Sequence, residues 1–199
     1  MVTASIYEEP RLAPESESVT MKLFHLVSSA LCTGLLATTS LAQMPAQEAA
    51  LSPPATATAT LADKPITVTY HAPSLRGRHL GSSEIVPYGE VWRTGANEAT
   101  TLTLPMDVTI GSLKVPAGTY TLFTLPTAKD WTLIFSKKTG EWGIPYPEGS
   151  DLGRTPMQKK TIASPQEVMT ISFEKTTANK TEMHVKWETT DAWVPIAAM

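Results

Sequence analysis

Short apolar–polar alternations, broken by frequent proline and glycine, are the feature that most constrains this fold. In the stretch PITVTYH, Ile66, Val68 and Tyr70 alternate with two threonines and a histidine. A period of two places alternate side chains on opposite faces of a β-strand. Sixteen prolines and eleven glycines in 199 residues add many turns. The sequence therefore predicts an all-β fold with little helix: an antiparallel β-sandwich, jelly-roll-like or a partly closed barrel.

Turn residues divide the rest of the chain into further strands. Breaks at Pro105, at Gly111-Ser112 and at Pro116-Ala117-Gly118 separate strand-like runs, and DWTLIFS is another short apolar run. The stretch EVMTISFEKTTANKTEMHVKWETT predicts a hairpin with its turn at residues 177–180. On this hairpin we expect Phe173 in the core and His184 on the solvated face. A short helical turn is conceivable at SPQEV, residues 164–168, where Ser164 would be the cap.

The N-terminal region predicts export. From Met21, a single lysine precedes an apolar stretch that ends in Ser40-Leu41-Ala42, which is typical of a signal peptide over residues 21–42 cleaved after Ala42. We therefore expect a periplasmic or extracellular protein with no membrane insertion after cleavage. The sole cysteine, Cys32, lies inside this segment, so the exported domain has no disulfide.

Three further segments complete the predicted organisation. Residues 1–20 are acidic and are interpreted as an upstream start-site artefact, with Met21 as the true start; a genuine extended leader is the alternative. Residues 43–63, rich in Ala, Thr and Pro, predict a disordered linker. Residues 64–199 then form a single β-sandwich domain. A net charge of -3 argues against a nucleic-acid partner; no cofactor is predicted, and the oligomeric state is left open.

Arginines in turn-rich sequence are the first candidates for a site. In VWRTGANEATTLTL, Arg93 and Asn97 flank a Gly-Ala turn, and Arg76 and Arg78 lie shortly before it. Guanidinium groups suit bidentate binding of a carboxylate or phosphate. The structural alternative is an arginine that bonds carbonyls at a strand end. Asn97 offers an amide to a ligand or simply tolerates a left-handed turn.

Aromatic and acidic loop residues extend this set. Tyr88 and Trp142 lie among glycines and prolines, where they would stack on a sugar or close the end of a sandwich. Glu98 or His79 could act as the general acid or base of a hydrolase. His71, His79 and Glu98 are a weak alternative as metal ligands, because their spacing matches no established motif. No metal site is therefore the preferred expectation.

Several of these segments resemble a known family. VPYGEVWRTGANEATTLTL, VPAGTYTLFTLP, WTLIFSKKTGEWG and the closing WVPI are similar to the bacterial exported family called domain of unknown function 2911. The resemblance runs from about Lys64 to Ile196 and implies export and a β-rich fold, without an established activity. The positions that match its signature are Arg78, Trp92, Arg93, Gly95, Ala96, Asn97 and Glu98.

These observations leave three functional hypotheses. The preferred one is a binding module for a polar or anionic small ligand or a glycan, with its site formed by Arg78, Arg93, Asn97, Glu98, Tyr88 and Trp142. A hydrolase that uses Glu98 or His79 is the second, and a purely structural envelope protein is the third. For the turn itself, we expect Gly95 to permit the conformation that orients Arg93 and Asn97, because a side chain there would crowd the backbone if its φ is positive.

Overall fold

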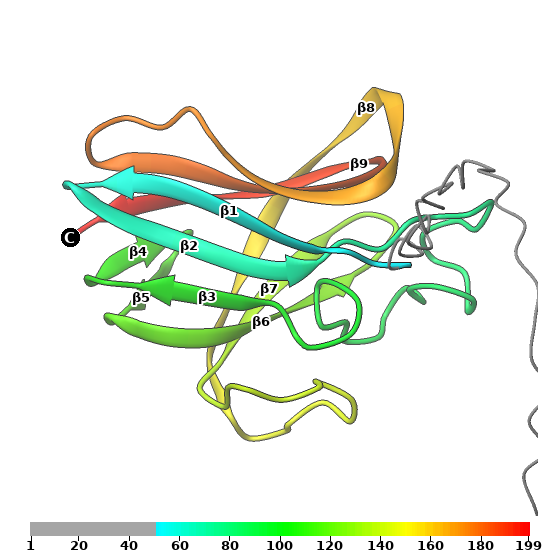
Figure 1. Ribbon diagram of the computed structural model, residues 1–199, viewed down its shortest axis with the longest axis horizontal. Coiled ribbons are helices and arrows are strands. Elements are labelled where there is room, and N and C mark those ends of the chain that lie inside the picture. The colour runs from blue at the N-terminus through cyan, green and yellow to red at the C-terminus, as the bar shows by residue number, and fades with distance from the viewer. Residues whose placement is uncertain (1–50) are drawn as a thin grey trace, which may run out of the picture. The chain divides into compact units, whose positions relative to one another are not determined.

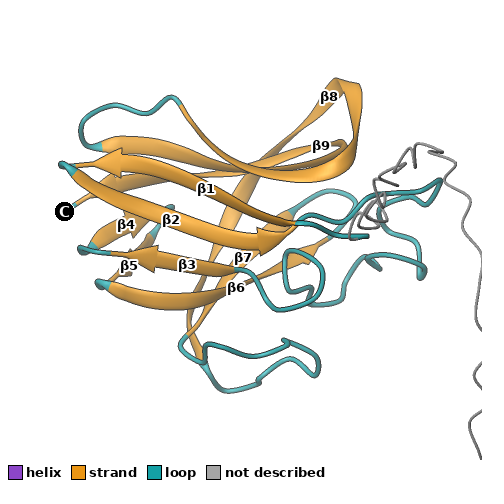
Figure 2. Ribbon diagram, viewed as in Figure 1, coloured by secondary structure: helices purple, strands orange, loops and turns teal. Residues whose placement is uncertain are grey.

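The computed structural model describes residues 51–199, which form an all-β domain (Figure 1). Nine strands make one antiparallel sheet in the order β1-β2-β3-β6-β7-β8-β9-β4-β5. In the range described, Figure 2 shows strands and loops only, and there is no helix that could cross a membrane. The strands are β1 (Pro54–Leu61), β2 (Lys64–His71), β3 (Thr101–Leu104), β4 (Val108–Ile110), β5 (Leu113–Val115), β6 (Gly118–Pro126), β7 (Trp131–Ser136), β8 (Asp151–Glu174) and β9 (Lys180–Ala198).

The predicted alternation and strand breaks are confirmed. In β2, Ile66 and Val68 are fully buried and Tyr70 is nearly so. The runs between Thr101 and Pro126 end at the three expected breaks and form β3, β4, β5 and β6. Proline and glycine interrupt the ladder here because proline lacks an N–H and glycine permits the turn conformations.

The sheet is sandwich-like because its longest hairpin folds back on itself. Strands β8 and β9 lose register between Thr161 and Gln166 and again before Thr170. Beyond this bend the two arms of β9 lie side by side: the N–H of Ala198 donates to the carbonyl of Asn179 at 2.9 Å. Figure 1 shows the resulting sharp turn of β8 and β9, and the sheet does not close into a barrel.

The same bend corrects the expected helical turn at residues 164–168. These residues are extended and form an irregular part of β8. Pro165 cannot donate to a ladder, so the strand bulges out of register there instead of ending. The chain keeps its extended path because both neighbouring stretches are paired to β9.

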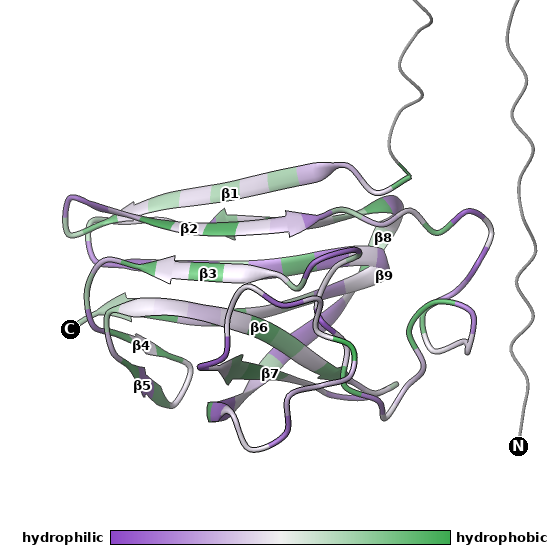
Figure 3. Cartoon of the chain, turned by 60° about the horizontal axis from the view of Figure 1, so that its bottom comes forward, coloured by the Kyte–Doolittle hydropathy of each residue, from purple (hydrophilic) through white to green (hydrophobic). Residues whose placement is uncertain are grey.

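Apolar side chains of both layers meet in a main core, and Ala99, Phe123 and Ile134 form a second, smaller cluster. Figure 3 shows hydrophobic residues along β6 and β7, and three tryptophans pack together in and against the main core. The rings of Trp92 and Trp187 are stacked 5.5 Å apart, and Trp131 meets Trp92 edge-on at 6.4 Å. Because Trp92 comes from the loop before β3, this cluster fixes that loop to the sheet.

The predicted hairpin exists, but one prediction about its faces is wrong. Its turn closes at Thr177, whose N–H donates to the carbonyl of Lys180 at 2.7 Å. His184 is 1% exposed rather than solvated, and Phe173 is only half-buried. The reason is the fold-back of β9, which lays Trp193 against the His184 ring at 5.6 Å and brings Asp191 to 2.7 Å from its Nδ1.

The domain also begins earlier than expected. The interpretation of residues 43–63 as a disordered linker is wrong for residues 54–61, which form β1 and pair along their whole length with β2. Alternating alanine and threonine puts small side chains inside and hydroxyls outside, and that suffices for an outer strand once β2 is beside it. The expectations for residues 1–20, for the signal peptide at 21–42 and for 43–50 fall outside the described residues.

Candidate functional site

The corner formed by residues 93–97, here called the RTGAN corner, is tied to the sheet by backbone and side-chain bonds. Trp92 exchanges two backbone hydrogen bonds of 2.8 Å with Thr124 of β6. Its indole Nε1–H donates to the carbonyl of Gly95 at 3.0 Å. Thr100 closes the loop, since its hydroxyl donates to the carbonyl of Thr94 at 2.9 Å. The corner is therefore a rigid platform.

Gly95 permits the turn, as expected, but not through a positive φ. Left-handed conformations occur instead at Thr94 and Asn97, each with φ of 54°. Gly95 is needed for close approach: a Cβ there would lie 2.9 Å from the Thr100 hydroxyl and 3.1 Å from the carbonyl oxygen of His71. A left-handed backbone is unfavourable for a β-branched residue, and Thr94 is fully buried. Such strain is often found beside functional groups.

A cavity of about 290 Å³ lies against this corner and is called the signature pocket below. Trp92 gives the pocket an aromatic surface and is stacked on the buried Trp187, and Ile85, Val86 and Ile144 add apolar surface. Two arginines and one carboxylate supply its charges. Its remaining lining residues are Ser52, Pro73, Arg78, Glu84, Arg93, Gly95 and Ala96.

Arg93 is the charged residue of this pocket with a buried, unpaired group, whereas the Glu84 carboxylate is exposed. Its Nη1 is buried and has no hydrogen-bond partner within residues 51–199. The guanidinium lies over the ring of Trp142, 5.0 Å from the centroid. Burial lowers the pKa of Arg93, and the negative charge of Glu98 acts in the opposite direction. The pocket is therefore lined by a partly desolvated cation that has one unpaired nitrogen.

Arg78 reaches the same pocket but has a different role. Its Nε–H donates to the carbonyl of Leu75 at 2.9 Å, and its two terminal nitrogens donate to the carbonyls of Ser74 at 3.0 Å and Glu84 at 3.2 Å. These bonds hold the loop after β2 in shape. Arg78 therefore bonds carbonyls as a structural arginine, which the sequence analysis gave as the alternative to ligand binding.

The other predicted site residues are spread around the pocket. Asn97 donates through its amide to the carbonyl of Ser52 at 3.4 Å and does not line the cavity. Tyr88 packs against Gly81, where a Cβ would collide with its ring. Trp142 is half-exposed and touches the pocket through Arg93. Of the six residues expected to form the site, the structure therefore places Arg78 and Arg93 in the pocket and Trp142 against Arg93.

His71 and His79 belong to two separate pairs: His71 lies beside Glu98, and His79 lies beside Glu188. Glu98 lies 3.3 Å from Nδ1 of His71, beside a different groove of about 270 Å³. His79 instead lies 2.6 Å from Glu188 and is mostly exposed. Within residues 51–199 no three such groups are placed to hold a metal ion. The weak alternative of a site from His71, His79 and Glu98 is therefore not assembled.

Sequence reasoning missed several residues that line the pocket. Trp187 alternates with the buried Met183 and Val185 on the hairpin, and no local pattern shows that its ring would also border a cavity. Ile144 carried a usable signal, because an apolar side chain in a Gly/Pro-rich loop is 67% exposed here. Glu84 also lines the pocket, because it lies on the loop whose carbonyls accept hydrogen bonds from Arg78.

Fold and pocket together define a small all-β domain with an aromatic-walled, arginine-containing cavity at the loop end of its sheet. The family model described as a protein of unknown function, DUF2911, matches residues 52–196. The chain belongs to this family, as the resemblance predicted. No curated protein and no solved structure matches it.

Proposed function

We propose that this domain is a binding module for a small carboxylate-bearing ligand, such as an acidic sugar, held in the signature pocket. The observation that carries the proposal is Arg93, which lines the cavity and whose buried Nη1 has no partner among the described residues. An unpaired buried donor destabilises a fold. A ligand carboxylate would satisfy it.

The lining of the pocket supports a ligand of this class. A guanidinium presents its N–H groups in a plane that matches a carboxylate. The half-buried Trp92 provides aromatic surface for a ring, and Trp187, which is 1% exposed, stacks on it. The volume of about 290 Å³ is near the lower end of small-molecule pockets, roughly 300 Å³. The ligand would therefore be one small ring with one acidic group.

Titration with glucuronate, followed by tryptophan fluorescence and amide NMR, tests this proposal. Glucose, which has no carboxylate, is the control ligand. We expect saturable binding of glucuronate, weaker binding of glucose, and loss of the difference in Arg93→Met. Arg76→Met is the control, because Arg76 is exposed and lies outside the pocket. Equal binding of both sugars, or an unchanged glucuronate affinity in Arg93→Met, would contradict the proposal.

We also infer that the protein is exported, with residues 21–42 as its signal peptide. The support is the single lysine and apolar run before Ser40-Leu41-Ala42. Intact-mass measurement on protein from an exporting host is expected to show a chain that begins at Gln43. A product that retains residues 21–42 would contradict this inference.

A further inference from the structure

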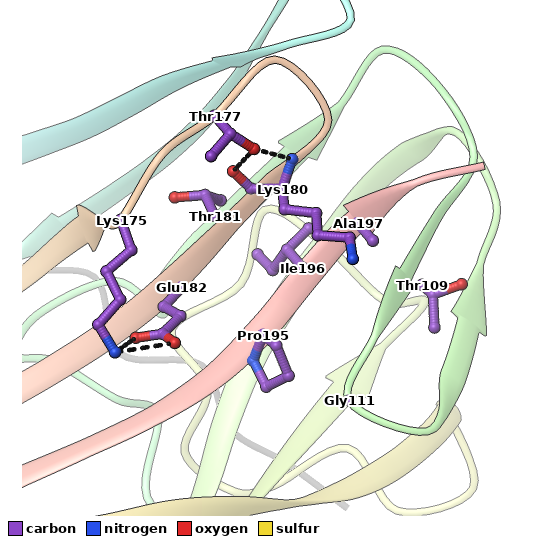
Figure 4. Close-up of a pocket in the computed structure, with 10 residues that line it drawn as sticks. All are labelled: Thr109, Gly111, Lys175, Thr177, Lys180, Thr181, Glu182, Pro195, Ile196 and Ala197. Carbon is purple, nitrogen blue, oxygen red and sulfur yellow. Dashed lines mark hydrogen bonds and ion pairs between the residues drawn. The ribbon is translucent and has the colours of Figure 1, made fainter.

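A second and larger cavity, of about 410 Å³, lies at the opposite end of the long hairpin (Figure 4). It is called the hairpin pocket here, and it is bounded by the hairpin tip, by residues 195–197 of β9 and by the end of β4. Two backbone bonds of 2.9 Å hold these walls together: Ala198 donates to Asn179, and Gly111 donates to Pro195. The pocket therefore depends on the fold-back of β9 and not on the RTGAN corner.

One wall of the hairpin pocket carries a fixed ion pair. The ammonium of Lys175 lies 3.2 Å and 3.0 Å from the two carboxylate oxygens of Glu182. Glu182 is also 3.2 Å from Nε2 of His184, and the other ring nitrogen of that buried histidine faces Asp191 at 2.7 Å. The hydrogen bond from Lys175 lowers the pKa of Glu182, so the carboxylate stays ionised. Lys175 is consequently neutralised by its neighbour.

Lys180 is the cation that remains. It has no ion-pair partner in the part of the chain that the structure describes. Figure 4 shows its side chain extending from the hairpin tip past Ile196 and Ala197, on the side away from the Lys175–Glu182 pair. The three charged residues of the pocket, Lys175, Lys180 and Glu182, therefore leave one net positive charge.

The floor below Lys180 is apolar. Pro195 is exposed and Ala197 is half-buried, and both lie on the last segment of β9. An ion that contacted Lys180 alone would leave this surface in water. A molecule with an acidic head and an aliphatic tail would use both the ammonium and the floor.

We propose that the hairpin pocket binds an amphiphilic monocarboxylate, with its head on Lys180 and its tail on the Pro195–Ala197 segment. This site is independent of the signature pocket and of the function proposed for it. The cavity is larger than the signature pocket, in keeping with an aliphatic tail.

Amide NMR titration with octanoate tests the proposal, with acetate as the head alone and octyl glucoside as an uncharged tail. We expect octanoate to shift the amides of Lys180, Ile196 and Ala197 saturably, and both controls to bind more weakly. Lys180→Gln should weaken octanoate binding by about tenfold, the loss expected for one charged hydrogen bond. Lys129→Gln is the matched control, because Lys129 is also exposed and lies on a different loop.

Three results would overturn the proposal. These are an unchanged octanoate affinity in Lys180→Gln, octyl glucoside binding as tightly as octanoate, and octanoate shifts centred on the RTGAN corner. Arg93→Met separates the two sites, since it should weaken glucuronate binding to the level of glucose and leave octanoate binding unaltered. Loss of octanoate binding in Arg93→Met would likewise contradict a separate site.

Discussion

Replacing Arg93 with methionine should leave the domain as stable as before, or make it more stable, while removing the preference for a carboxylate-bearing ligand. Methionine keeps the unbranched stem but carries no N–H. The substitution removes a buried unpaired donor, Nη1, whose burial costs about 1–3 kcal/mol. It also loses the contact with the half-exposed Trp142 ring, worth about 0.5–1 kcal/mol. The gain minus the loss is an increase in unfolding free energy of between about zero and 2.5 kcal/mol.

Thermal and urea melts measure this effect, with Arg78→Met as the matched arginine. At about 2–4 °C per kcal/mol for a domain of this size, Arg93→Met should raise the Tm by between zero and several degrees. Arg78→Met should lower unfolding free energy by at least about 2 kcal/mol, because three carbonyls lose charged hydrogen bonds. Equal losses of stability in both variants would refute the distinction and make Arg93 a structural residue.

Three further predictions concern stability and titration. His184→Ala should cost about 3–5 kcal/mol in urea melts, because it leaves the buried Asp191 carboxylate without its closest partner; a change below about 0.5 kcal/mol would restore the solvated-face interpretation. Hydrogen bonds from Lys186 and Lys175 lower the pKa of Glu174 and Glu182 respectively. The two carboxylates therefore stabilise the fold above pH 4.5, and this stabilisation is lost as the pH falls below that value. Melts from pH 7 to 3 should show a smaller loss of stability in acid for Glu182→Gln than for the parent. Burial and the hydrogen bond to Asp151 raise the pKa of Tyr146 to about 12. The protonated phenol therefore stabilises the fold below pH 10, and this stabilisation is lost between pH 10 and 12. In an ultraviolet titration, Tyr146→Phe should lack one late-titrating phenol that the parent shows.

Local pattern predicted most of the strands because period two and turn chemistry act over a few residues. The breaks at Pro105, Gly111 and Pro116 depend only on missing donors and permitted backbone conformations, so they hold in any surroundings. The same local reasoning failed at β1. Alanine and threonine bury too little surface to order a free segment, and only pairing with β2 makes residues 54–61 a strand.

The sequence by itself determined the strand content, the hairpin turn at residues 177–180 and the corner where Arg93 stands, since each depends on neighbours in the chain. Tertiary structure alone decided which arginine is engaged: Arg78 meets three carbonyls, whereas Nη1 of Arg93 meets none in the described part of the chain. It also decided the burial of His184, which alternation places outside. The fold-back of β9 brings Asp191 and Trp193 onto that face, and a contact between residues seven and nine positions apart within one strand requires a bend that no period reveals.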